Sequence, residues 1–382
     1  MNLFGWKGLR ALRRPPLARA DGWWGVAHSP NVPRAGARYV ERAQQAYLHN
    51  PVAQRCCRMI AEAIAGAPLL ASDARIAALL TARPLGLAPL QQLATHLLLH
   101  GNAYAQILPG ADDVPAELFV LRPEHMAVEA DGDGWPIAYA YRHGGSTARI
   151  PAMDPRGRVQ ILHIKLTHPA DDHYGASCLG AAAAAVAVHD AAAEWNLALL
   201  ANAARPSGAL IHTPPDGGPP LSDAQVKRLR ADLEAQFQGS GNAGRPLLLE
   251  GGLSWQALSL SPAEMDFLSL KDSAARDIAM AFGVPPMLIG ISGDATYANY
   301  REASKALWRQ TILPLSEVIF APLRAALAGW GLDGALAIDL DKLPALAEDR
   351  ERLWAQLIAA DFLSADEKRA MLGLEPSRGD GA

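Results

Sequence analysis

The sequence predicts an α+β protein, because helical and strand patterns occupy separate parts of the chain rather than alternating. Capped amphipathic helices are indicated over 51–65 and 89–100. Short apolar runs between 103 and 164 are separated by glycine- and aspartate-rich turns and indicate strands. Long helical patterns dominate beyond residue 178. We therefore expect a mixed unit followed by a mainly helical part.

The composition favours an architectural protein over an enzyme. The chain has 382 residues, of which 50% are hydrophobic and 19% charged, and this length suggests two or three structural units. The apolar content excludes wholesale disorder, and a formal net charge of −4 excludes a basic protein that coats nucleic acid through charge alone. Three cysteines, two of them adjacent, exclude a disulfide-stapled scaffold. Neither a glycine-rich phosphate loop nor a Gly-x-Ser-x-Gly elbow occurs.

The first 38 residues are rich in arginine, proline, glycine and tryptophan, and we expect an arm that only its neighbours order. Trp23 and Trp24 are expected either to dock on a partner or to pack on their own domain. The start of the chain has no apolar run of signal-peptide length. The most apolar stretch, 180–204, carries three ionisable side chains, so no membrane span is expected. Unpaired cysteines fit a reducing cytoplasm.

The first two helices carry clear boundary signals. Asn50 suits an N-cap and Pro51 suits the first helical position. Cys56 lies on the apolar stripe of this helix and is expected in the core, whereas Cys57 points about 100° away from it. Strands are expected after the second helix, at 103–108, 118–121, 126–129, 137–141 and 159–164.

The second half of the chain is predicted to contain long helices before and after an inserted module. A helix over 178–204 precedes a small α/β module at 208–260, with strands at 209–212, 246–250 and 254–258 and a helix over 221–237. A helix over 262–282, a loop over 290–296 and a helix over 297–327 follow, and Pro314 predicts a kink in the last of these. The chain is expected to end with a strand at 336–340, a helix over 346–360 and a helix capped at Ser364.

Candidate catalytic or metal-binding residues are few. His163, His168 and His173 are spaced by five, which matches neither one helix face nor the common zinc spacings. With Asp171 and Asp172 nearby they could hold a metal, and the alternative is that they are ordinary loop and strand histidines. No cofactor is implied by any motif.

Several phrases, taken together and in chain order, resemble one protein family. They lie at 50–65, 68–69, 97–104, 162–165, 174–177, 195–196, 202–208, 282–290, 296–303 and 308–314. This order resembles that of tailed-bacteriophage portal proteins of the Hong Kong 97 type. The alanine- and arginine-biased composition is similar to that of portals from prophage-derived gene transfer agents.

The resemblance implies a structural protein without catalysis or cofactor. Portal subunits form a ring, usually of twelve copies, at one vertex of the capsid in a virion or phage-like particle assembled in the bacterial cytoplasm. Its implied partners are the major capsid protein, the terminase large subunit, a head-tail adaptor and double-stranded DNA that passes through without sequence specificity. The implied domains are an arm (1–38), a wing (39–176), a first stem helix (177–207), a clip (208–260), a second stem helix (261–284), a tunnel loop with a kinked tunnel helix (285–330) and a crown (331–382).

The same resemblance places two sets of residues along a DNA channel. The tunnel loop would comprise Ile291, Ser292, Gly293, Asp294, Ala295 and Thr296, whose small side chains could touch DNA without strong binding. The stem helix over 262–282 would present Glu264, Asp266, Lys271, Asp272, Arg276 and Asp277, a net charge of −2 per copy that repels the duplex. The alternative for this helix is a solvated outer face. The alternatives for the whole chain are a metal-dependent enzyme built on the three histidines and an interaction scaffold that encloses no DNA.

Overall fold

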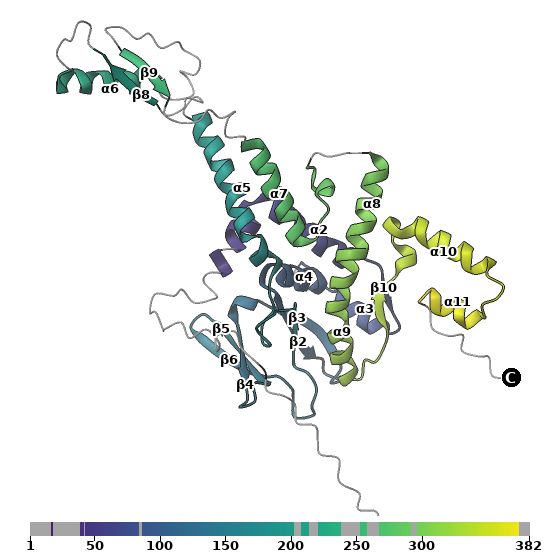
Figure 1. Cartoon of the computed structure of the whole chain (residues 1–382). Coiled ribbons are helices and arrows are strands. Elements are labelled where there is room, and N and C mark those ends of the chain that lie inside the picture. The colour runs from purple at the N-terminus through teal and green to yellow at the C-terminus, as the bar shows by residue number, and fades with distance from the viewer. Residues whose placement is uncertain are drawn as a thin grey trace, which may run out of the picture. The chain divides into compact units, whose positions relative to one another are not determined.

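The protein is described from a computed structural model. The structure describes residue 17 and residues 39–41, 43–83, 86–201, 208–213, 221–237, 253–257, 267–291 and 296–373. The chain divides into two compact units. One unit holds Met1–Ala181 and Met280–Ala382, and the other holds Ala182–Ala279. Each is described by itself (Figure 1).

The larger unit begins with a capped helix whose sequence signals are confirmed. After η2 (Gln44–His49), the helix α2 covers Pro51–Gly66. The Oδ1 atom of Asn50 accepts hydrogen bonds from the backbone N–H groups of Val52, at 3.1 Å, and Ala53, at 3.0 Å. Both Cys56 and Cys57 are fully buried. The expectation for Cys57 was thus incomplete, because α2 is covered on more than the one face that its apolar stripe marks.

Replacing Asn50 with alanine is expected to lower the free energy of unfolding by about 1–2 kcal/mol, because two N–H groups lose their acceptor at a buried helix start. Urea unfolding measures the change. Asn50→Ser is the matched control, since serine also caps helices, and it is expected to lose only a fraction of that amount. Equal losses in the two variants would contradict the capping role.

Two antiparallel three-stranded sheets form the mixed part of this unit. The first has the order β3 (Pro115–Leu121), β2 (Asn102–Pro109) and β7 (Ile161–Lys165). The second has the order β4 (Met126–Ala130), β5 (Pro136–His143) and β6 (Ser146–Pro151). The five expected strands are therefore confirmed, while β6 was missed. Five of its six residues are exposed, and its sequence lacks the apolar alternation that marks a strand.

A buried core joins the two sheets to each other. Tyr104 from β2 packs with Leu121, Met126, Val128, Tyr139 and Ile161, all of them buried. The helix α4 (Pro89–His100) packs on α2 and ends at Gly101, whose φ of 82° turns the chain into β2. A short helix α3 (Ala74–Thr81) and a strand β1 (Leu69–Ala71) were not expected. The strand β1 pairs with β10 (Leu336–Ile338), which ties the two ends of the unit together.

The long helix after residue 296 is continuous but irregular. It consists of α8 (Tyr297–Leu307), the π-helical segment η7 (Trp308–Ile312) and α9 (Leu313–Gly329), which run on as one helix in Figure 1. The irregularity expected at Pro314 takes the form of this π-helical segment just before the proline. A proline ring clashes with the carbonyl of the preceding turn, and the wider π-helix relieves that clash.

The helix Tyr297–Gly329 is long and apolar enough to cross a membrane by length and composition. Ile319, Phe320 and Leu323 are nevertheless buried inside the larger unit, as in the core helix of a folded domain. Beyond the helix, the indole Nε1 of Trp330 donates to the carbonyl of Val159 at 2.8 Å. The guanidinium of Arg158 lies 3.8 Å above the same indole ring.

The end of the larger unit is built from short elements. After η6 (Pro286–Ile289), the long helix and β10, the turns η8 (Leu340–Lys342) and η9 (Pro344–Leu346) lead to α10 (Ala347–Ala359) and α11 (Ala365–Met371). The expected cap at Ser364 is confirmed as a capping box with Glu367. The expected strand 336–340 is shorter than predicted, because Asp339 leaves the strand and caps η8 instead.

The smaller unit contains a strand pair and helices. The strands β8 (Gly208–His212) and β9 (Leu253–Ala257) are antiparallel, and the helix α6 (Asp223–Phe237) lies between them in sequence. The helices α5 (Cys178–Ala201) and α7 (Phe267–Phe282) run into this unit and bury small side chains such as Ala192 and Ala275. The strand expected over 246–250 lies outside the described residues.

Candidate functional site

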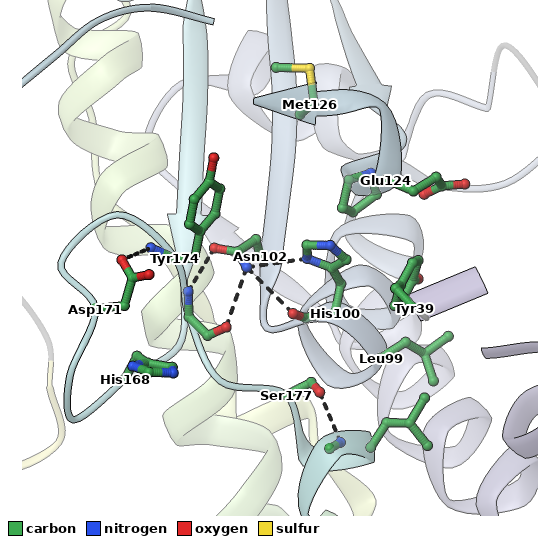
Figure 2. Close-up of a pocket in the computed structure, with 14 residues that line it drawn as sticks. Tyr39, Leu99, His100, Asn102, Glu124, Met126, His168, Asp171, Tyr174 and Ser177 are labelled. Carbon is green, nitrogen blue, oxygen red and sulfur yellow. Dashed lines mark hydrogen bonds between the residues drawn. The ribbon is translucent and has the colours of Figure 1, made fainter. Parts of the chain in front are cut away.

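Asn102, at the start of β2, is the centre of a buried hydrogen-bond cluster (Figure 2). Its Oδ1 atom accepts from the backbone N–H of Gly175 at 2.8 Å and lies 3.1 Å from Nε2 of His163. Its Nδ2 atom lies 3.2 Å from Nδ1 of His100 and 3.4 Å from the carbonyl oxygen of Gly175. One side chain therefore joins the end of α4, the strand β7 and the loop before α5.

Two glycines let these backbone segments approach closely. A Cβ atom on Gly175 would overlap the carbonyl oxygen of Gly101 and lie 2.6 Å from the backbone N and O of Leu166. A Cβ atom on Gly101 would in turn overlap the carbonyl oxygen of Gly175 and lie 2.7 Å from the carbonyl carbon of Ala176. The N–H of Leu166 donates to the carbonyl of Gly101 at 2.9 Å. A Cβ atom does not fit at either position, so both residues must be glycine for steric reasons.

A pocket of about 510 Å³ lies beside this cluster. Figure 2 shows polar side chains around it, among them Glu124, His168 and Asp171. These groups also serve the local structure. Asp171 Oδ1 accepts from the N–H groups of His173 and Tyr174, at 2.7 and 3.0 Å, and the Tyr174 hydroxyl accepts from the N–H of Val128 at 3.0 Å. The pocket is thus lined by groups that hold a loop in place.

The three candidate histidines do not form a metal site. His163 stacks on Tyr104, with ring centres 4.3 Å apart, and burial together with the nearby Lys165 lowers the pKa of His163 to about 3. His168 is half-buried, and its Nδ1 accepts from the N–H of Ala170 at 3.1 Å. His173 is buried in the following loop. Across the part of the chain that the structure describes, no group of three His, Cys, Asp or Glu side chains is placed to hold a metal ion.

The segment expected to form the tunnel loop is described only at its two ends. Ile291 follows Gly290, whose φ of 82° ends η6, and Thr296 caps α8 by accepting from the N–H of Asn299 at 3.2 Å. Ser292, Gly293, Asp294 and Ala295 lie outside the described residues. Thr296 therefore has a structural role that the sequence analysis did not assign to it.

The charges expected on the second stem helix are described in part. Lys271 and Asp272 are half-buried on α7, while Arg276 and Asp277 are exposed opposite the buried Ile278. Lys271 lies near enough to His189 of α5 to add to the effect of burial in lowering the pKa of that histidine. These four described charges balance one another. Glu264 and Asp266, which supply the expected acidic excess, lie outside the described residues, so the repelling surface stays a prediction.

A charged cluster that the sequence analysis missed joins α8 to α10. The basic side chains Arg301, Lys305 and Arg309 contact Glu348 and Asp349 in the first turn of α10. The spacing of four residues between the three basic groups is visible in the sequence and puts them near one face of a helix. The acidic partners lie 40 to 47 residues further along, so the pairing itself was not visible.

Comparisons with known proteins agree on the class. The family model for Phage portal protein matches residues 51–373. An uncharacterized protein of Rickettsia felis is 39% identical over 350 residues, which is 87% of this chain and 88% of that protein. A probable portal protein of Streptomyces phage phiC31 is 28% identical over 297 residues, which is 75% of this chain and 63% of that protein.

Solved structures show the same fold. A chain in the virion of a native gene transfer agent particle is 47% identical, with a TM-score of 0.68, and the match covers 89% of this chain and 94% of that one. An HK97 family phage portal protein from Corynebacterium diphtheriae has a TM-score of 0.56 at 17% identity, over 80% of this chain and 98% of that chain. The α+β fold class is thereby confirmed.

The mixed fold and these matches define the class as a structural protein of phage and phage-like particles. The chain belongs to the Phage portal protein family. The resemblance drawn from the phrases in the sequence is confirmed. Three of those phrases, at 97–104, 162–165 and 174–177, meet around Asn102, which explains them as parts of one structural cluster.

Proposed function

We propose that this chain forms the ring at one vertex of a capsid through which double-stranded DNA is packaged and ejected. The observation that carries the proposal is the 47% identity to a chain of the gene transfer agent virion over nearly the whole length. Chains in the neck of the native and empty particles, computed with C12 and C6 symmetry, match equally well. A ring of twelve copies agrees with both symmetries.

The segments of this chain fit that role as follows. The larger unit would supply the wing and, from residue 331, the crown, while the smaller unit would supply the clip between two stem helices. The clip would face the terminase large subunit during packaging and a head-tail adaptor afterwards, and the wing would meet the major capsid protein. Gly290 and the Thr296 cap fix the two ends of the loop proposed to reach the DNA.

A chain with a small net charge suits a channel for DNA. Each Lys or Arg that contacts a phosphate releases counterions and strengthens binding, so many such contacts would slow a sliding duplex. The net charge of −4 per copy, and the balanced charges described on α7, avoid this effect.

The ring is tested by imaging the purified protein and the particle that contains it. We expect closed rings with twelvefold symmetry at the vertex. A monomer or dimer under all conditions, together with a neck that lacks this chain, would overturn the proposal.

Deleting residues 291–296 is expected to leave ring assembly intact and to reduce packaged DNA severalfold, because the loop that touches the duplex is lost. Nuclease-protected DNA per particle is the measurement. Thr296→Ala is the control, since it removes only the cap of α8 and should keep DNA near the wild-type amount. Unchanged DNA in the deletion particles would count against the loop.

A further inference from the structure

Three basic side chains form a row along the helix that follows the proposed tunnel loop. Arg301 and Lys305 lie on α8, and Arg309 lies on η7, at steps of four residues. Four residues advance an α-helix by about 6 Å and turn it a little more than once, so the three groups lie near one face. We call these three residues the basic row.

The first turn of α10 covers the basic row. Arg301 Nη1 lies 2.5 Å from Glu348 Oε1, and Arg309 Nη2 lies 2.6 Å from Asp349 Oδ2. Lys305 Nζ, between them, lies 3.5 Å from Glu348 Oε2 and 3.3 Å from Asp349 Oδ1. Figure 1 shows α10 beginning next to α8. The two carboxylates of α10 therefore contact all three cations, and Glu302 of α8, whose Oε1 lies 3.2 Å from Lys305 Nζ, is a third acidic partner.

The exposure of the basic side chains differs between the centre and the ends of the row. The Lys305 side chain is only 10% exposed, whereas those of Arg301 and Arg309 are 43% and 55% exposed. Hydrogen bonds that Lys305 donates to the carboxylates of Glu302 and Asp349 raise the pKa of Lys305, so this amine stays charged. The outer two cations remain within reach of a second anion, whereas the central one is largely covered.

The helix α10 also contacts the rest of the larger unit at sites outside the basic row. Arg350 Nε lies 2.6 Å from Asp341 Oδ1, and the indole Nε1 of Trp354 donates to the same carboxylate at 3.2 Å. The contacts of α10 with η8 thus hold the helix near α8 when the ion pairs at its start are lost. Partly exposed ion pairs contribute about 0–1 kcal/mol each, so another anion can replace these carboxylates at modest cost.

Phosphate is the anion that the row fits. Guanidinium and ammonium groups bind carboxylate and phosphate through the same charge-assisted hydrogen bonds. Several cations in a line suit a polyanion with regularly spaced charges, such as the backbone of duplex DNA.

We propose that the basic row binds the phosphate backbone of duplex DNA, and that Glu348 and Asp349 occupy the row when no DNA is there. The two carboxylates compete with the DNA phosphates for the basic row, and this competition keeps the affinity for DNA low. This inference rests on the proposed function, in which duplex passes this chain, and it names the residues that touch the duplex and those that limit the contact.

The test is the affinity of the full-length chain for a random duplex of about 30 base pairs in about 50 mM salt. The variant Glu348→Gln/Asp349→Asn keeps the size of both side chains and removes their charge. We expect it to bind about tenfold more tightly than the wild type, and the slope of log K against log salt to steepen by about 2 for two or three new phosphate contacts. The control Glu351→Gln/Asp361→Asn removes two exposed charges from the same region, outside the ion pairs of the row.

A second variant shows whether the row causes the gain. Adding Arg301→Gln/Arg309→Gln to Glu348→Gln/Asp349→Asn is expected to return the affinity to the wild-type value. In the wild-type background Arg301→Gln/Arg309→Gln should weaken binding severalfold, which keeps the test valid if loss of the carboxylates prevents folding. Equal affinities for Glu348→Gln/Asp349→Asn and its control, or a gain that survives loss of both arginines, would overturn the inference. The channel itself is tested separately by the DNA content of the loop-deletion particles.

Discussion

Replacing Gly175 with alanine is expected to remove about 4 kcal/mol or more of the folding free energy of the larger unit, a large part of the stability of a typical domain. The added methyl group would overlap the carbonyl of Gly101 and lie 2.6 Å from the backbone of Leu166, and neither backbone segment can move without breaking the hydrogen bonds of Asn102. Urea unfolding of the purified variant, or its absence from the soluble fraction, measures the effect.

Gly132→Ala is the matched control for this prediction. A Cβ atom on Gly132 meets nothing within 4 Å. Alanine there restricts the unfolded chain and is expected to be neutral or to stabilise by up to about 1 kcal/mol. Gly175→Ala should therefore lower the free energy of unfolding, and Gly132→Ala should not. A Gly175→Ala protein of wild-type stability would show that the cluster around Asn102 is not packed as described.

Acidification is expected to destabilise the larger unit by up to about 4 kcal/mol between neutral pH and about pH 5. Burial lowers the pKa of His163 to about 3 and that of His96 to about 4, both below the 6.5 of an unfolded histidine. Below pH 6.5 the unfolded chain binds protons that the folded chain rejects. The stability is thus complete above this pH and is lost as the pH falls toward the folded values, at up to about 1.4 kcal/mol per pH unit for each histidine.

The free energy of unfolding in urea at several pH values measures this loss. His163→Gln removes one of the two groups and should roughly halve the dependence on pH. His49→Gln is the control, because the His49 side chain is exposed, and this variant is expected to keep the pH dependence of the wild type. A wild-type stability that stays constant between neutral pH and pH 5 would contradict the buried, neutral state of both histidines.

Elements with strong local signals were predicted from the sequence within a few residues. The Asn50 cap, the end of α4 at Gly101 and the capping box at Ser364 each depend on residues within four positions of the helix end that they mark. The strand β6 lacks such signals, because it is polar and exposed. The helix α3 was missed although Asp73 caps it, and it is only eight residues long.

The candidate sites were predicted less well than the elements. His163, His168 and His173 were considered as a ligand set because Asp171 and Asp172 lie nearby in sequence, but the sheet and the loop give the three histidines separate environments. The cluster around Asn102 and the cover on the basic row join residues 40 to 73 positions apart, which no local pattern reveals. Three of the family phrases meet in this cluster, which their order in the sequence did not show.

The sequence by itself determined the α+β class, most element boundaries, the lack of catalytic motifs and the portal family, because caps, periodicity and composition act over a few residues. Only the tertiary structure decided that Gly101, Asn102, His163 and Gly175 form one buried cluster, that His163 in this cluster and His96 on α4 are held neutral, and that the basic row is covered by α10. These features depend on desolvation and on contacts between distant segments, and both arise only when the chain has packed.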